Sequence, residues 1–136
     1  MKISFRLEYA CRVLTSLANH YGRAKLARIE DLARDEVVPA NYLVRILNDL
    51  REAGVLESKR GTRGGYTLAR PPEDISLRDI AAAVEPDMVS SVTSQPGLSG
   101  PRVADAFRKI SENLAAELAK VTLRDLAGTG QSHYDI

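Results

Sequence analysis

The sequence predicts a mainly α-helical protein with one small β-hairpin, and two observations lead to that prediction. Apolar residues recur at spacings of three and four along most of the chain, as on the buried face of a helix. Residues 55–68 instead form two short strand-like runs around a turn rich in glycine. The length of 136 residues suits one domain with an appended helix, and 44% hydrophobic residues suffice for its core.

Length and composition exclude several classes of protein. No run of about 18 apolar residues is present, so we expect no membrane span. The first residues, MKISFRLEYACRV, carry charges where a signal peptide needs an apolar run, which favours a cytoplasmic protein. The single cysteine, Cys11, excludes an internal disulfide and a multi-cysteine metal site within one chain.

Two helices are predicted before the hairpin region. Residues 4–21 carry an apolar stripe, and Gly22 is placed to end that helix. Residues 28–36 form the second helix. Cys11 lies in the first stripe, so it is expected to pack like a small apolar residue. The apolar faces consist of Leu7, Ala10, Cys11, Leu14, Leu17, Ala18 and Tyr21 in the first helix, and of Ile29, Leu32 and Ala33 in the second.

A third helix is predicted from Pro39 to Ala53. Pro39 suits the first helical turn, because its missing N–H is no loss there, and Gly54 is placed for a left-handed cap. The buried face should consist of Leu43, Ile46, Leu47 and Leu50, with a polar face opposite. Two helices joined by so short a turn form a helix-turn-helix. Val37 stands where such turns often carry glycine, and a positive φ would be costly there, so we expect a slightly different turn.

The hairpin is predicted from Val55–Lys59 and Tyr66–Leu68, joined by a turn with three glycines. The net charge of the chain is only +1, but residues 58–70 hold four bases and no acid. Local basic patches steer proteins onto phosphates, although a merely solvated hairpin tip is the alternative. A polar-faced helix followed at once by a basic hairpin is typical of a winged helix-turn-helix that binds DNA. The bases are Lys59, Arg60, Arg63 and Arg70.

The C-terminal half predicts two more helices. Ser76 is a plausible N-cap for a helix over 77–85, and Pro86 should end it. The stretch 87–101 is rich in Ser, Gly and Pro and should be a mobile loop. A long helix follows to about residue 121, with a narrow seam that suits pairing with a second subunit or with its own domain. The seam consists of Val103, Phe107, Ile110, Leu114, Leu118 and Val121.

These elements divide the chain into four parts. We expect a DNA-binding domain over 1–86, a flexible loop over 87–100, a dimerisation helix over 101–127 and a frayed tail over 128–136. Of the two pairings open to the long helix, a second subunit is favoured, because two short halves of a DNA-reading module usually need one another.

The motifs together resemble the Rrf2 (Rrf-two) family of bacterial winged-helix transcription regulators, to which IscR-like and NsrR-like repressors belong. The resemblance covers nearly the whole chain. It is carried by Pro39-x-x-Tyr42-Leu43-x-x-Ile46-Leu47-x-x-Leu50-Arg51-x-Ala53-Gly54, by Ser58-x-Arg60-Gly61-x-x-Gly64-Gly65-Tyr66-x-Leu68-Ala69, and by Pro71 and Ile75-x-Leu77. The Arg-Gly-x-x-Gly-Gly-Tyr hairpin is its most specific part.

The resemblance implies a sequence-specific regulator, in particular a repressor, that binds a palindromic operator as a homodimer crossed through the long C-terminal helices. The third helix would enter the major groove, and Arg60 would reach a minor groove, whose negative potential attracts arginine. Tyr42 has two open interpretations: a contact to bases, or a ring packed against the core. The expected DNA-binding residues are Pro39, Ala40, Asn41, Tyr42, Arg45, Lys59, Arg60, Gly61 and Arg63.

The chain departs from the family at one place. Many members carry three cysteines before the last helix that hold an iron–sulfur cluster, whereas residues 87–101 contain none. We therefore expect no metal and no cofactor, and a small-molecule effector of unknown identity.

Two other classes of function stay open beside the cluster-free DNA-binding regulator. One is a thiol-based redox regulator that uses Cys11, and the other is a winged-helix module that binds protein. No Ser-His-Asp order, HExxH motif or phosphate-binding loop indicates an enzyme, so no catalytic residue is assigned.

Overall fold

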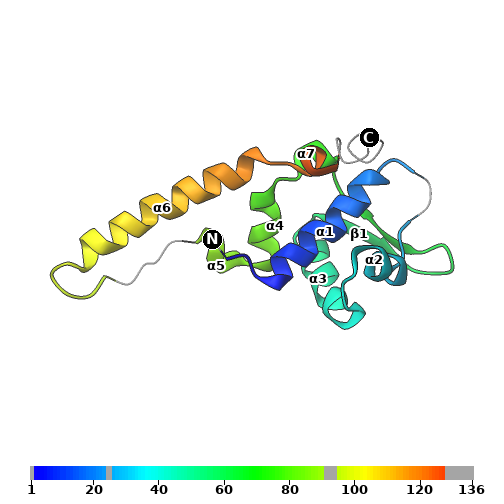
Figure 1. Ribbon diagram of the computed structural model, residues 1–136, viewed down its shortest axis with the longest axis horizontal. Coiled ribbons are helices and arrows are strands. Elements are labelled where there is room, and N and C mark those ends of the chain that lie inside the picture. Colours follow the sequence, from blue (N-terminus) through cyan, green and yellow to red (C-terminus); the bar gives the residue numbers. More distant parts are fainter. Residues whose placement is uncertain (1, 24–25, 91–94, 128–136) are drawn as a thin grey trace.

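A computed structural model describes residues 2–23, 26–90 and 95–127 (Figure 1). These residues form a mainly helical fold with one two-stranded antiparallel sheet, which confirms the predicted fold class. None of the helices in these ranges combines the length and apolar character that a bilayer span requires. The elements are α1 (Phe5–Asn19), α2 (Ile29–Glu36), α3 (Ala40–Glu52), β1 (Leu56–Lys59), β2 (Gly65–Leu68), the short 3-10 helix η1 (Pro72–Asp74), α4 (Leu77–Val84), α5 (Pro86–Val89), α6 (Gly100–Lys120) and α7 (Leu123–Ala127).

Helix α1 lies at the centre of the core, where it contacts α2, α3, α4 and α7. Its first turn is capped by Ser4, whose hydroxyl accepts from the backbone N–H of Leu7 at 3.2 Å. The predicted stripe is correct except at its edges. Cys11 is only half-buried, Tyr21 lies beyond the end of the helix with 43% of its surface exposed, and Val13 is fully buried instead.

Helix α3 buries the face that the sequence predicts, since Leu43, Ile46, Leu47 and Leu50 are each at most 1% exposed. The helix begins one residue later than expected, because Pro39 is its N-cap rather than part of its first turn. Gly54 has a φ of +78° directly after the helix, as predicted for a left-handed cap.

The turn between α2 and α3 differs from the sequence expectation. Val37 has a φ of 54° and a ψ of 55°, so it takes the left-handed conformation that is costly for a β-branched residue, and the prediction that it would avoid a positive φ is wrong. Two contacts around it outweigh the cost: the N–H of Val38 donates to the carbonyl of Ala33 at 3.0 Å, and the Val38 side chain is buried. The Val37 side chain itself is 78% exposed, so it meets no steric opposition from the core.

The hairpin pairs Leu56 with Leu68 at its base and Lys59 with Gly65 near its tip. A third segment joins its edge, because Ala27 and Tyr66 exchange two backbone hydrogen bonds of 3.1 and 2.7 Å. Gly65 is required for this approach: a Cβ there would lie 2.4 Å from the Ala27 carbonyl oxygen, and its φ is +152°. The hairpin is therefore fixed to the segment that leads into α2.

The region after the hairpin contains more helix than expected. Ser76 and Asp79 form a reciprocal capping box at the start of α4, with hydrogen bonds of 3.2 and 2.9 Å. Pro86 does end α4, but it also opens the short helix α5, so the prediction of an irregular segment from residue 87 is wrong at this point. Residues 95–99 of the predicted loop contain no helix or strand, whereas residues 91–94 and the predicted tail at 128–136 lie outside the described residues.

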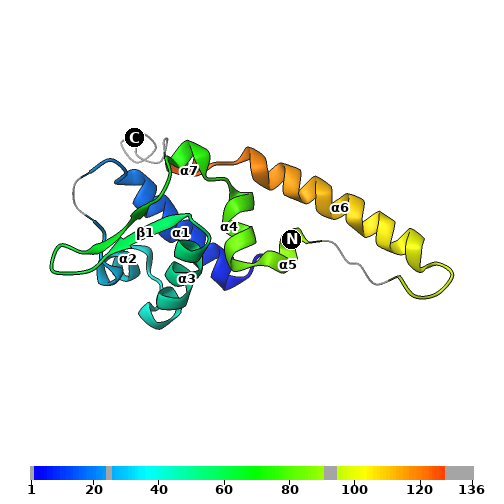
Figure 2. The same ribbon diagram turned by 180° about the vertical axis from the view of Figure 1, so that it is seen from behind.

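The predicted long helix is divided near its C-terminal end. Helix α6 ends at Lys120, and the extended backbone of Val121 pairs with Leu77 through a 2.9 Å hydrogen bond. Helix α7 then returns to α1, and Leu123 is completely buried in the core. In both views α6 leads away from the body on the side opposite the hairpin (Figures 1 and 2).

The strained turn generates a stability prediction. Replacing Val37 with glycine should stabilise the protein by about 0.5–1 kcal/mol, because glycine removes a left-handed cost of about 1–2 kcal/mol and adds a smaller entropy cost on folding. Chemical denaturation measures the change. Val44→Gly is the matched control, since Val44 is an exposed residue inside α3 and glycine there should destabilise by about 0.5 kcal/mol. A less stable Val37→Gly protein would show that the valine contributes packing there.

Candidate nucleic-acid interface

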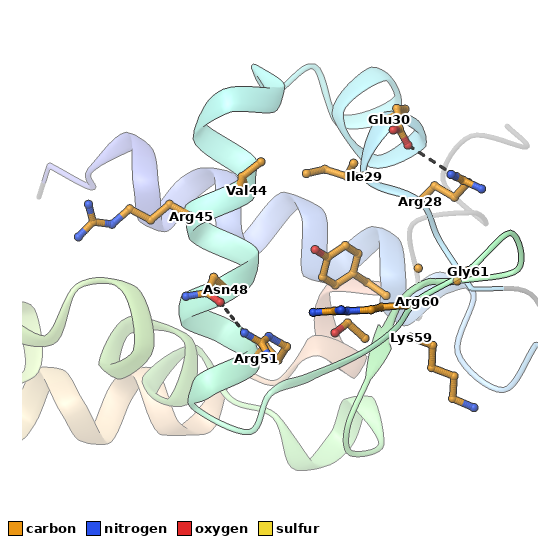
Figure 3. A pocket seen from close by; sticks show the side chains of 14 residues that line it. Arg28, Ile29, Glu30, Val44, Arg45, Asn48, Arg51, Lys59, Arg60 and Gly61 are labelled. Atoms are coloured by element: carbon orange, nitrogen blue, oxygen red, sulfur yellow. Dashed lines mark hydrogen bonds and ion pairs between the residues drawn. The ribbon is translucent and has the colours of Figure 1, made fainter.

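A groove of about 590 Å³ lies between α3 and the hairpin (Figure 3). Three segments form it, because α2 and its lead-in close one end, the exposed face of α3 forms a wall and the hairpin forms the other wall. The groove therefore depends on the contact that joins the hairpin to Ala27. It is lined by Arg28, Ile29, Glu30, Val44, Arg45, Asn48, Arg51, Ser58, Lys59, Arg60, Gly61, Gly64, Gly65 and Tyr66.

The groove carries a positive charge that the whole chain does not show. Its lining includes five basic side chains and one acid, Glu30, for a net of +4, against +1 for the full sequence. Glu30 lies 3.7 Å from Arg28, so the single acid is paired at the edge of the groove. A surface of this charge attracts a phosphate backbone, and the attraction should fall as salt is added.

The basic side chains point in different directions (Figure 3). The guanidinium of Arg60 turns from the hairpin toward α3, whereas Lys59 extends away from the groove, and Arg45 leaves α3 on the side away from the hairpin. Arg51 is held by Asn48, whose side-chain oxygen accepts from its Nη2 at 2.6 Å. Charges of one sign thus cover the groove and both of its flanks.

Ten of the fourteen groove residues were not among the predicted site residues, and three of them, Arg28, Asn48 and Arg51, have polar side chains suited to contacts with DNA. Asn48 and Arg51 continue the exposed row of Val44 and Arg45 at spacings of four and three, so the helical period could have found them. Arg28 has no such signal. Its Nη1 donates to the carbonyl of Thr62 at 3.3 Å and connects the start of α2 to the hairpin tip.

The other predicted DNA-binding residues lie around this groove. Pro39, Ala40 and Asn41 are exposed at the start of α3, and Arg63 is exposed at the hairpin tip. Tyr42 combines its two interpretations: it is 56% exposed, and its ring centroid lies 6.3 Å from that of Tyr9 on α1.

One base of the hairpin region has a different role. Arg70 lies 4.0 Å from Asp79 and donates to the carbonyl of Asp74 at 3.3 Å. These contacts connect the segment after the hairpin to η1 and α4, so Arg70 belongs to the scaffold and not to the charged groove.

The predicted seam of α6 separates into two parts. Val103, Phe107 and Ile110 are 53%, 55% and 60% exposed, which is unusual for large apolar side chains. Leu118 instead packs against the core of its own chain, and Val121 lies outside the helix. Only the N-terminal part of the seam therefore presents a free apolar row.

Comparison with known proteins decides the family. Residues 3–129 match the Rrf2 family model, which is described as an iron-dependent transcriptional regulator. The chain belongs to the Rrf2 family of transcriptional regulators. The regulator IscR of Cereibacter sphaeroides is 32% identical over 122 residues, which cover 87% of this chain and 79% of that protein. Protein rrf2 of Nitratidesulfovibrio vulgaris is 31% identical over 126 residues, which cover 93% and 81%.

Solved structures agree with this assignment. CymR of B. subtilis, titled the global cysteine regulator, superposes with a TM-score of 0.77 at 26% identity, covering 94% of this chain and 97% of that one. The oxidized form of Staphylococcus aureus CymR gives 0.72 at 31% identity, covering 93% and 96%. This Rrf2 protein is a DNA-binding transcriptional regulator and not an enzyme, and the predicted resemblance is confirmed.

The residues of this Rrf2 protein do not fit an iron–sulfur cluster. Such clusters are held mainly by several cysteine thiolates, and the sequence contains one cysteine. Within the described residues, no group of three or more His, Cys, Asp or Glu side chains is placed to hold a metal ion. The iron dependence in the family description therefore has no matching set of ligands among the residues that the structure describes.

The environment of Cys11 also opposes a reactive thiol. Burial raises the pKa of Cys11 from 9.0 to about 11, and the nearby Glu8 carboxylate adds to the increase. The thiolate is the reactive form, so almost none is present near neutral pH. The half-buried side chain behaves as a small packing residue at the edge of the core.

The raised pKa predicts slow chemistry at Cys11. Alkylation by iodoacetamide at pH 7.5 should be on the order of 100-fold slower than for free cysteine, and its rate should keep rising toward pH 11. The folded state holds this proton more tightly, so its contribution to stability is complete below about pH 9 and is lost as pH rises through about 11. Cys11→Ala should remove this loss of folding stability between about pH 9 and pH 11. Rapid labelling of the folded protein at pH 7.5 would contradict the assignment.

Proposed function

We propose that this regulator binds a palindromic operator as a homodimer, with α3 in the major groove and the hairpin at the adjacent minor groove. The observation that carries the proposal is the groove of net charge +4 between α3 and the hairpin. Specific recognition needs charge to hold the phosphates and polar side chains to read the base edges. The exposed face of α3 supplies the second requirement through Asn41, Arg45 and Asn48.

The division of work within the interface follows from where the side chains lie. Lys59 extends into solvent away from the groove, so its role is a phosphate contact (Figure 3). Arg60 and Gly61 form the hairpin corner that approaches the minor groove, where a guanidinium is favoured by the narrow groove's potential. Arg28 acts indirectly, because its hydrogen bond to Thr62 sets the position of the hairpin tip.

The homodimer is supported by the free apolar row on α6. Val103, Phe107 and Ile110 are each more than half exposed, on a helix that leads away from its own domain. Leu114, the next residue of the row, is half-buried. Apolar rows with spacings of four, three and four suit helix pairing, and the resemblance to Rrf2 regulators implies a dimer crossed through this helix. A two-fold dimer would present two copies of the charged groove to two half-sites.

The regulatory mode follows the same reasoning. We infer repression in the bacterial cytoplasm, by occupancy of the operator and without a cluster, since the chain lacks the thiols for one. Thiol sensing through Cys11 is the weaker alternative, because burial keeps that thiol protonated. A protein-binding role is disfavoured by the charge of the groove.

The hairpin roles can be tested by two substitutions. Lys59→Ala should weaken binding to operator and to random duplex alike, and reduce the slope of log affinity against log salt by about one. Arg60→Ala should cost about 1–3 kcal/mol on the operator and clearly less on random duplex. Fluorescence anisotropy on an operator selected from a random duplex library measures both.

Lys109→Ala is the control for these two variants, because Lys109 is an exposed base on α6, on the side away from the hairpin. Its affinity should equal that of the unmodified protein. If Lys59→Ala and Arg60→Ala both behave like this control, the hairpin takes no part in binding.

The dimer can be tested on α6. Phe107→Glu combined with Ile110→Glu should give a folded monomer, because two carboxylates would have to be buried in the interface. Operator affinity should fall by at least about 100-fold, since a monomer binds only one half-site at a time and loses the avidity of the dimer. Sedimentation measures the mass and circular dichroism the fold. Ala119→Glu, on the exposed opposite side of α6, should stay dimeric. An unmodified protein that is monomeric at micromolar concentration would refute the proposal.

A further inference from the structure

A second cavity lies behind the hairpin, on the side away from α3. It encloses about 320 Å³ between the C-terminal end of α1, helix α2 and strand β2. Its floor is apolar, because the buried side chains of Leu17 and Leu32 and the half-buried Tyr66 contribute to it. This size lies at the lower end of the range for sites that bind small organic molecules.

The rim of the cavity carries charges of both signs on opposite elements. Asp31 and Asp35 stand on α2, while His20 and Arg23 follow α1. Arg34 contacts one oxygen of each aspartate, at 3.1 and 3.3 Å, so each carboxylate keeps its other oxygen for a ligand. Arg23 makes no ion pair with any residue that the structure describes.

The hydrogen bond that His20 makes to its own helix leaves one ring nitrogen, Nε2, free to contact a ligand. Its Nδ1 lies 2.8 Å from the carbonyl oxygen of Ser16, and a carbonyl can only accept, so Nδ1 must carry the proton. Nε2 is then the ring nitrogen left to interact with a ligand, as an acceptor in the neutral ring and as a donor in the charged one. The rim therefore holds two cations, Arg23 and the paired Arg34, two carboxylates and the His20 ring around an apolar floor.

The cavity shares structure with the DNA-binding groove. Tyr66 lines both spaces, and Ala27, which lines the cavity, is followed directly by Arg28 of the groove. Tyr66 and Ala27 are joined by the two backbone hydrogen bonds that position the hairpin. A molecule in the cavity lies beside this pair, so a ligand that displaced the pair would also shift the hairpin relative to α3.

We propose that this cavity binds a small zwitterion of the class of a free α-amino acid, and that its occupancy changes the affinity for DNA. The carboxylate pairs with Arg23, the ammonium group with the free oxygens of Asp31 and Asp35, and a short apolar side chain lies on the floor. Arg23 and Arg34 balance Asp31 and Asp35, so the lining has no net positive charge that would favour a nucleotide or another polyanion. The DNA-coupled part rests on the proposed function, whereas the binding part does not.

Calorimetry on the full chain without DNA tests the binding part, with the twenty standard α-amino acids as probes. At least one should bind with a Kd below about 1 mM. Arg23→Ala should weaken that binding at least tenfold, because it removes the partner of the carboxylate. Arg124→Ala is the matched control, since it removes an exposed arginine on α7, and it should leave the Kd within twofold. Absence of binding by every probe, or equal binding by Arg23→Ala, would overturn the site.

Operator affinity with and without the bound amino acid tests the coupling. We expect a change of at least about fivefold in the unmodified protein, and no change in Arg23→Ala at the same concentration. By reciprocity, the operator should change the amino-acid affinity by the same factor. Binding that leaves the operator affinity unchanged would overturn the regulatory part. A failure of DNA binding itself would leave the calorimetric result intact, so the two failures are distinguishable.

Discussion

Burial of the apolar face of α3 is the constraint on which the rest of the structure depends. Leu43, Ile46, Leu47 and Leu50 are almost completely buried, and each such side chain contributes about 1.5–3 kcal/mol when it leaves water. The helix cannot rotate without exposing them, so the residues on its opposite side are fixed toward solvent. Arg45, Asn48 and Arg51 are exposed for this reason, so burial of one face of α3 fixes the polar face that it presents to solvent.

The second requirement is that the hairpin stands at a defined distance from α3. Gly65 makes this possible, since it lets the strand approach the Ala27 carbonyl more closely than any side chain would permit. The bridge of Ala27 with Tyr66 then fixes the hairpin to the segment before α2, and Arg28 extends the connection to Thr62. The bridge of Ala27 with Tyr66 consists of uncharged backbone hydrogen bonds, which salt does not screen, and it helps to hold the positive side chains of the groove in place.

The chain holds one cysteine, which is too few for an iron–sulfur cluster bound by several thiolates. That cysteine is half-buried, and burial raises its pKa to about 11, so the thiol stays protonated near neutral pH. The cavity behind the hairpin suggests another arrangement. A ligand in this cavity would contact Tyr66, which directly follows Gly65, the glycine that positions the hairpin. Such a ligand could move the hairpin without any bound metal.

The sequence by itself determined the elements whose signal is local. Helical spacing predicted the buried face of α3, glycine predicted the left-handed cap at Gly54, and Ser76 predicted the start of α4. The density of bases in the hairpin also pointed correctly to DNA. Each of these predictions depends on residues that lie within about one or two helical turns of one another, so the pattern can be seen directly in one sequence.

The tertiary structure alone decided what depends on contacts between distant segments. Val37 accepts a left-handed conformation because the buried Val38 holds the turn, which no local preference would indicate. Leu123 returns to the core and Val121 leaves the seam because they pair with residues around Ile75 and Leu77, more than forty positions earlier. No local pattern separates Arg70 from Arg28, yet Arg70 contacts Asp79 of α4, whereas Arg28 contacts the hairpin tip at Thr62 and lines the groove. The role of each arginine depends on the residues that the fold brings next to it, and for Arg28 that residue, Thr62, lies 34 positions along the chain.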